Sequence, residues 1–300
     1  MTKGIASLAR SREGDDDSGE DPALARRLLG TRLRTLRVAA GLKGYDVGRA
    51  IGASHSKISR LESGLLGFRL PDLEKLLTLY GVGDTARRTE YVNLARRANA
   101  PGHRHIDAEV APRWYDTYLA FEDSATLMRS YSPGIVPELL QTPEYARGVL
   151  DIACPGAPDD FGHTELLERR QRRLTGPDPL RLWVLLEQSV LRRQIGSTQA
   201  WRAQLEHMGR VSELVNVTIQ IVPDHVCGPV LSAVPFTLMR FGNPDLSDIV
   251  HLHHATSGQF LDRRGDLDAY HSIWDRLCIK ALQPERSSRI IEGVAFGAVV

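Results

Sequence analysis

The segment 54–63 carries side chains that could contact nucleic acid. Ile58 and Leu61 recur three residues apart, as on the inner face of an amphipathic helix, while His55 and Arg60 fall on the outer face. Basic and hydroxyl side chains donate hydrogen bonds to phosphates and to base edges. The spacing therefore predicts a helix over 55–63 whose exposed side is suited to DNA.

A second set of residues could bind a metal. His251 and His253 lie in a predicted strand over 248–254, so both imidazoles point to one face. No carboxylate or cysteine stands beside them in the sequence, although Asp248 or His271 could approach in space, and metal sites usually need about three or four converging ligands. We interpret both as partly hydrogen-bonded imidazoles on a strand with polar edges, and we expect no metal and no cofactor. The chain also lacks a phosphate-binding loop, a nucleophile elbow and a zincin motif, so we expect no enzyme.

A run of arginines and a stripe of aromatic residues are interpreted as structural. The basic run is interpreted as a solvated helix face that pairs with neighbouring glutamates: Arg169, Arg170, Arg172 and Arg173 beside Glu165 and Glu168. An aromatic stripe at helical spacing is interpreted as core or dimer packing: Trp114, Tyr115, Tyr118 and Phe121.

Charge is distributed unevenly along the 300 residues. The net charge of +1 combines −2 over residues 1–20, +9 over 21–104 and −6 over 105–300. A basic segment joined to an acidic body indicates that one part meets a polyanion and the other part does something else.

Composition narrows the class of protein. Hydrophobic content of 42% and charged content of 25% are typical of a globular chain. No apolar stretch approaches the roughly 20 residues that span a bilayer, and we expect no secretory signal. The three cysteines are widely spaced and form no C-x-x-C. We therefore expect a cytoplasmic protein without disulfides or a cysteine-based zinc site.

Glycines and a capping serine along the chain predict the boundaries of the elements that must position the basic helix. We expect a disordered tail over 1–21, a helical domain over 22–98, a linker over 99–112 and a second domain over 113–295. Gly48 predicts a close approach of two backbones, Gly52 a sharp turn with positive φ, and Ser54 the N-cap of the helix 55–63. Two short helices joined in this way place the second one in the major groove of DNA.

The second domain has mixed periodicity. Helices are predicted at 114–130, 143–153, 162–174, 187–194, 198–214, 265–282 and after 284. Strands are predicted at 180–186, 217–222, 235–241, 248–254 and 258–261. This pattern indicates an α+β fold with a small, mostly antiparallel sheet.

The segment from Gly41 to Gly64, GLKGYDVGRAIGASHSKISRLESG, resembles the helix-turn-helix of the Cro and phage-repressor (XRE-type) family. The resemblance implies three base-reading residues: His55, Ser56 and Arg60. It implies three contacts to phosphates or the DNA backbone: Lys43, Lys57 and Arg69. It also implies a structural ion pair between Arg37 and Glu62 that ties the first helix to the third.

The second domain is similar to the C-terminal domain of WhiJ-like, antitoxin-like regulators of actinobacteria. Four strings carry the resemblance: PELLQTPEYAR at 137–147, ERRQRRL at 168–174, LWVLLEQ at 182–188 and PFTLM at 235–239. It implies a repressor or antitoxin-like regulator that is often paired with a small protein encoded nearby, and it supplies no catalytic residues. Glu138 departs from a usual glycine, and His251 and His253 stand where tyrosine and glutamate are common.

Together these features predict a sequence-specific DNA-binding transcriptional regulator, a repressor that reads the major groove with the helix 55–63. Arg60 is the expected principal reader, since arginine pairs with a guanine edge. We expect a homodimer on a double-stranded operator, and a second domain that mediates dimerisation and responds to a partner or a small molecule. Two alternatives stay open: an antitoxin that acts chiefly by binding a small partner protein, and an enzyme domain that the helix-turn-helix targets to DNA.

Overall fold

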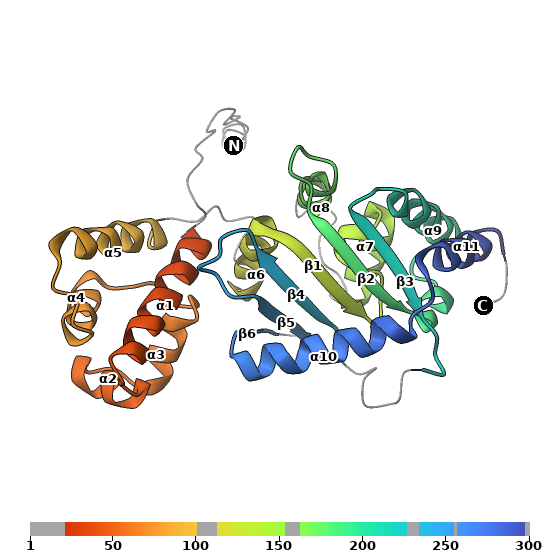
Figure 1. Cartoon of the computed structure of the whole chain (residues 1–300). Helices are drawn as coiled ribbons and strands as arrows, with labels where there is room; N and C mark the ends of the chain where they lie inside the picture. Colours follow the sequence, from red (N-terminus) through yellow and green to blue (C-terminus); the bar gives the residue numbers. More distant parts are fainter. Residues whose placement is uncertain (1–21, 101–112, 154–162, 227–233, 255–256, 298–300) are drawn as a thin grey trace, which may run out of the picture.

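The computed structural model describes residues 22–100, 113–153, 163–226, 234–254 and 257–297. The predicted tail over 1–21 and most of the predicted linker over 99–112 lie outside these ranges, as do Cys154 and Cys227. The described residues form two lobes, a helical one from the N-terminal third of the chain and one built around a sheet (Figure 1). Within these ranges, no helix has the length and apolar character needed to cross a bilayer.

Five helices form the helical lobe, and they pack around a single apolar core. They are α1 (Pro22–Ala39), α2 (Gly44–Ile51), α3 (His55–Glu62), α4 (Leu70–Leu79) and α5 (Thr85–Ala98). Leu29, Leu33, Val47, Leu73 and Leu77 are each at most 1% exposed and hold these helices together. The predicted helical character of this region is confirmed.

The second lobe is an α+β fold, as predicted. Its elements are α6 (Arg113–Ser124), β1 (Ala125–Ser132), η1 (Glu138–Leu140), α7 (Pro143–Ala153), α8 (His163–Gln171), η2 (Arg172–Leu174), β2 (Arg181–Glu187), η3 (Gln188–Arg192), α9 (Thr198–Ser212), β3 (Val217–Val222), β4 (Phe236–Phe241), β5 (Ile249–His254), β6 (Ser257–Leu261), α10 (Arg264–Lys280) and α11 (Pro284–Ala295). The strands form one sheet in the order β3-β2-β1-β4-β5-β6. Three of its five pairings are antiparallel, and β1–β2 and β2–β3 are parallel.

The sheet corrects one prediction. The expected helix over 114–130 ends at Ser124, and the chain continues directly into β1, which lies between β2 and β4. Pairing on both sides satisfies the backbone of β1, and this tertiary contact overrides the helical pattern of the sequence. The expected helices over 162–174 and 187–194 are shorter as well, and each includes a 3-10 segment.

Helices cover both faces of the sheet. On one face lies α10 (Figure 1), whose Trp274 belongs to one buried apolar cluster with Tyr131, Leu238 and Val250 of the sheet. On the other face α6 packs Phe121, whose ring centroid lies 5.3 Å from that of Phe260 in β6. The helix α6 is therefore held between the sheet and the helical lobe, since it also contacts α1.

The two lobes meet at a buried arginine. Arg27 of α1 is 2% exposed, and its Nη1 donates to Asp262 Oδ2 at 2.7 Å and to the carbonyl of Ser63 at 3.2 Å. Its Nη2 donates to Ser247 Oγ at 3.0 Å. Burial lowers the pKa of Arg27, and the carboxylate of Asp262 opposes that shift. A second interlobe pair, Arg32–Asp245 at 2.8 Å, is exposed on both sides.

We expect the buried and the exposed interlobe ion pair to contribute very differently to the free energy of unfolding. Asp262→Asn should lower the free energy of unfolding by about 3–5 kcal/mol, because it leaves the buried charge of Arg27 without its counter-ion. Asp245→Asn, the matched exposed change, should cost about 0–1 kcal/mol. Denaturant unfolding of both variants checks this, and equal effects would show that Arg27 is not a buried anchor.

At Gly30 the backbones of α1 and α3 approach each other closely. A Cβ at this position would lie 2.5 Å from the carbonyl oxygens of Leu61 and Glu62. Gly30→Ala should therefore lower the free energy of unfolding by about 1–3 kcal/mol, although alanine favours helix formation. Gly265→Ala in α10 is the control, since nothing lies within 4 Å of its Cβ, and it should stabilise by up to about 1 kcal/mol. Thermal unfolding that shifts both variants in the same direction would contradict this packing.

Candidate nucleic-acid interface

A cap and a glycine turn fix the angle between α2 and α3. Gly52 ends α2 with a φ of 73°, and the hydroxyl of Ser54 accepts from the amide of Lys57 at 3.1 Å. At Gly48 a Cβ would lie 2.7 Å from the carbonyl oxygen of Ala53, so only glycine fits. The turn, the cap and the close approach are those that the sequence predicts.

The helix α3 has one buried apolar face and one exposed polar face. Ile58 and Leu61 are 2% and 3% exposed, whereas His55, Ser56 and Arg60 are exposed. Within the described part of the chain, these three polar side chains make no hydrogen bond or ion pair. Their donors and acceptors are therefore free to meet base edges.

The residues expected at phosphates differ in their surroundings. Lys43 and Arg69 are exposed at the N-caps of α2 and α4. Lys57 Nζ lies 3.0 Å from Asp72 Oδ2, in a half-buried ion pair. A phosphate at Lys57 would have to compete with that carboxylate, so Lys43 and Arg69 are the cationic side chains more readily available to DNA.

Arg37 and Glu62 form a bidentate ion pair between α1 and the end of α3. The distances are 2.5 Å for Nε–Oε1 and 2.9 Å for Nη2–Oε2, and Arg37 Nη1 also donates to the carbonyl of Leu42 at 2.8 Å. The hydrogen bond to Glu62 raises the pKa of Arg37. Side-chain contacts thus join α3 to α1 and to the loop before α2.

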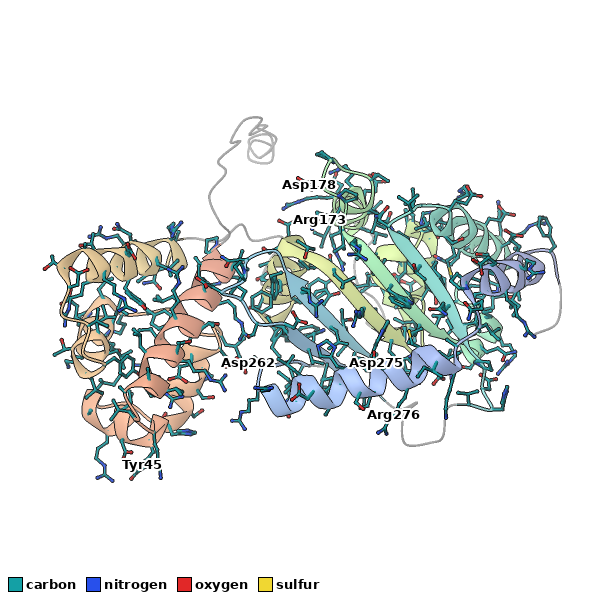
Figure 2. All side chains as sticks on the ribbon, in the orientation of Figure 1. Tyr45, Arg173, Asp178, Asp262, Asp275 and Arg276 are labelled. Carbon is teal, nitrogen blue, oxygen red and sulfur yellow. The ribbon has the colours of Figure 1, made fainter. Side chains whose placement is uncertain are left out.

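Sequence reasoning missed a cation–aromatic pair on α2. Tyr45 is 59% exposed at the lower end of the helical lobe in Figure 2, and Arg49 Cζ lies 5.0 Å from its ring centroid. The i, i+4 spacing of the two residues was the available signal. The first helix of a helix-turn-helix crosses the DNA backbone, so Tyr45 and Arg49 join the candidate interface.

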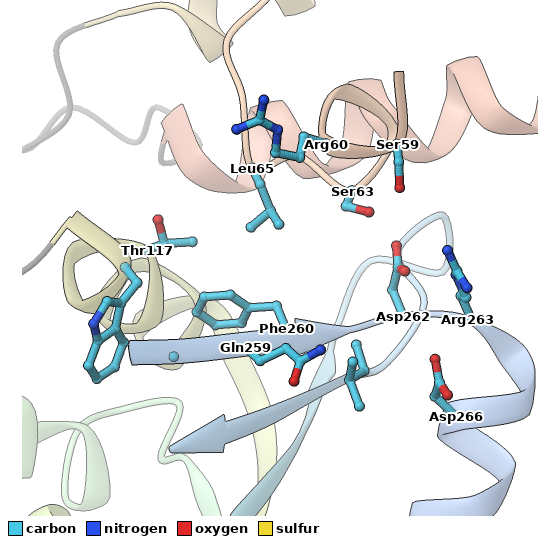
Figure 3. Close-up of a pocket in the computed structure, with 13 residues that line it drawn as sticks. Ser59, Arg60, Ser63, Leu65, Thr117, Gln259, Phe260, Asp262, Arg263 and Asp266 are labelled. Carbon is cyan, nitrogen blue, oxygen red and sulfur yellow. The ribbon is translucent and has the colours of Figure 1, made fainter. Parts of the chain in front are cut away.

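A cavity of about 680 Å³ separates the end of α3 from the second lobe (Figure 3). Ser59, Arg60 and Ser63 line its upper wall, and Asp262 and Asp266 lie opposite. Figure 3 shows the guanidinium of Arg60 directed away from these carboxylates. His55 and Ser56 do not line the cavity. Of the three predicted base-reading residues, only Arg60 therefore borders the interlobe cavity.

The sequence predicts that the arginines over 169–173 form a solvated helix face, and this prediction is wrong for Arg170. This side chain is 7% exposed and forms a bidentate pair with Glu122, at 2.6 and 2.8 Å. Its Nη1 also donates to Glu138 Oε2 at 2.5 Å and to the hydroxyl of Tyr115 at 2.9 Å. These partners lie 32 to 55 residues away in sequence, so the local pairing with Glu165 or Glu168 could not reveal them.

His251 and His253 point to the same side of β5, toward α6. His251 is 2% exposed and stacks on Trp114 with ring centroids 5.7 Å apart, and the His253 ring lies 5.3 Å from that of Trp114. Burial lowers the pKa of His251 to about 3, with smaller contributions from His253 and His254. Among the described residues, no group of three or more histidine, cysteine, aspartate or glutamate side chains could hold a metal ion.

Comparisons with known protein families match two separate parts of the chain. Residues 28–89 match a family described as a helix-turn-helix domain, and residues 115–293 match a family described as a domain of unknown function, DUF5753. No curated protein and no solved structure matches the chain. The second match covers more than half of the 300 residues, and the chain therefore belongs to the DUF5753 family, with a helix-turn-helix domain preceding the family domain.

Proposed function

We propose that the protein is a sequence-specific, DNA-binding transcriptional regulator that reads the major groove with α3. The observation that carries this proposal is the free, polar outer face of α3, where His55, Ser56 and Arg60 have no partner among the described residues. The major groove is about 12 Å wide and admits one helix. The N-cap at Ser54 and the Arg37–Glu62 pair support a helix presented in one fixed orientation.

The basic surroundings of α3 support the same proposal. Lys43, Arg49 and Arg69 are exposed around this helix, in a segment whose net charge is +9 over residues 21–104. Contacts to phosphates supply affinity without sequence preference, whereas side chains at base edges supply specificity. The lobe therefore offers both kinds of contact.

The finer parts of the proposal concern how regulation is achieved. We propose a cytoplasmic repressor that binds as a homodimer to half-sites about one helical turn apart, as helix-turn-helix proteins do. The second lobe would supply dimer contacts and respond to a small molecule or a partner protein. In the antitoxin alternative, the same chain would co-purify with a small partner whose toxicity it suppresses.

We further propose that the second lobe does not act as an enzyme. Its buried carboxylates have structural partners: Glu122 pairs with Arg170, and Glu187 accepts a hydrogen bond from the hydroxyl of Tyr131. These contacts support roles in packing and positioning for both acids.

Selection of binding sites from random duplex DNA tests the proposal. Arg60→Ala should lose preference at one or two base pairs, since an arginine–guanine contact discriminates by about 1–3 kcal/mol. Lys43→Ala should weaken binding to all sequences and reduce the salt slope by about one.

Arg286→Ala provides the matched control. This exposed arginine lies on α11, at the end of the second lobe far from α3 (Figure 1), and its loss should leave both affinity and preference unchanged. An unaltered sequence preference in Arg60→Ala would remove Arg60 from the reading residues. Absence of any selected sequence for the wild type would contradict the proposed function.

A further inference from the structure

A small cavity lies between α6 and the sheet, at the point where β1 and β5 end and β4 begins. Its volume is about 120 Å³. Tyr115 and Tyr118 of α6, Glu138 of η1 and His251 of β5 are among its lining residues. The size suits a ligand of only a few heavy atoms.

Aromatic rings form one wall of this cavity. The rings of Tyr115 and Tyr118 stack with centroids 6.0 Å apart, and the imidazole of His251 lies 4.7 Å from the ring of Tyr118. Strand register places Ser130, Thr237 and His251 side by side on one face of the sheet, and all three line the cavity. The cavity therefore offers both ring faces and hydrogen-bonding groups.

The electrostatics of the cavity favour a cation. Glu122, Glu138 and Arg170 together carry one net negative charge, and the Glu138 side chain keeps 30% of its surface exposed. Burial opposes ionisation of Glu138, but Arg170 and the hydrogen bond from Tyr115 lower its pKa overall. His251 adds no positive charge at neutral pH, because burial lowers its pKa to about 3.

The tyrosine rings already accept one cation. The guanidinium carbon of Arg170 lies 5.9 Å from the ring centroids of both Tyr115 and Tyr118. An ammonium group inside the cavity would be attracted to these π-systems and would also donate a charge-assisted hydrogen bond to Glu138. An anion there would be repelled by the same carboxylate.

We propose that this cavity binds a small alkylammonium ion. The ammonium group donates to the carboxylate of Glu138, and the alkyl part lies against the rings of Tyr115 and Tyr118. This inference names a ligand class for the small-molecule response proposed above and rests on that part of the proposed function. Binding to the protein alone is measured without DNA, so its failure is distinguishable from a failure of DNA recognition.

The position of α6 gives such a ligand a route to the helical lobe. Tyr115 and Tyr118 line the ligand cavity, whereas Trp114 and Thr117 of the same helix line the interlobe cavity that Arg60 borders. His251 also stacks on Trp114, which joins the two cavities through one pair of rings. A ligand that shifts α6 therefore acts on the wall opposite the end of α3.

Isothermal titration of the full chain with n-butylammonium tests the proposal, with 1-butanol as the neutral probe of similar shape. We expect saturable binding of n-butylammonium and binding of 1-butanol that is at least about tenfold weaker, because the alcohol lacks the charge that Glu138 attracts. Glu138→Gln keeps the shape and the hydrogen-bond acceptor but removes the charge, and it should weaken n-butylammonium binding about tenfold or more. Glu144→Gln, the same change at an exposed position on α7, should leave it unchanged.

A second pair of variants tests the ring wall independently of Glu138. Tyr118→Phe keeps the ring and should bind as the wild type does, whereas Tyr118→Leu should bind about threefold to tenfold more weakly. Absence of saturable binding by n-butylammonium overturns the proposal. Equal affinity for 1-butanol, or unchanged affinity in either Glu138→Gln or Tyr118→Leu, also overturns it.

Discussion

The buried guanidinium of Arg27 is the constraint on which the arrangement of the two lobes depends. A charge at 2% exposure requires a counter-ion and hydrogen-bond acceptors, and the structure supplies them from Asp262, Ser247 and the carbonyl of Ser63. One side chain thus joins α1, the end of α3 and the loop after β6. Because Ser63 is the C-cap of α3, the contact that joins the lobes also positions the end of the proposed recognition helix. A change in the second lobe that altered Asp262 would reach the end of α3 through the side chain of Arg27.

The parts of this fold that sequence predicts are those with local causes. The positive φ at Gly52, the N-cap at Ser54 and the inward spacing of Ile58 and Leu61 all arise within about ten residues of one another. Each is a statement about one turn of backbone or one helix face, so the printed sequence contains the information needed. The same reasoning places the outward residues of α3 correctly on an exposed face, although it does not show that Arg60 also borders the interlobe cavity.

The parts that sequence reasoning missed have distant causes. The strand β1 follows α6 without a turn, and only its pairing with β2 and β4, more than 50 and 100 residues away, distinguishes it from a longer helix. Arg170 sits in a run of arginines beside glutamates, yet its partners Glu122 and Glu138 come from other elements. The positions noted as departures in the second lobe, Glu138, His251 and His253, prove to line one cavity. Their proximity depends on strand register and on the packing of α6, which no local pattern reports.

The most direct test of major-groove reading by α3 replaces guanine by 7-deazaguanine, one position at a time, in the selected operator. This base lacks the N7 acceptor that an arginine contacts in the major groove. Reading by Arg60 predicts that one replacement weakens wild-type binding about tenfold and has no effect on Arg60→Ala. Uniform wild-type affinity across all replaced guanines, or an equal loss in both proteins, would contradict the assignment of Arg60 as the residue that reads the sequence.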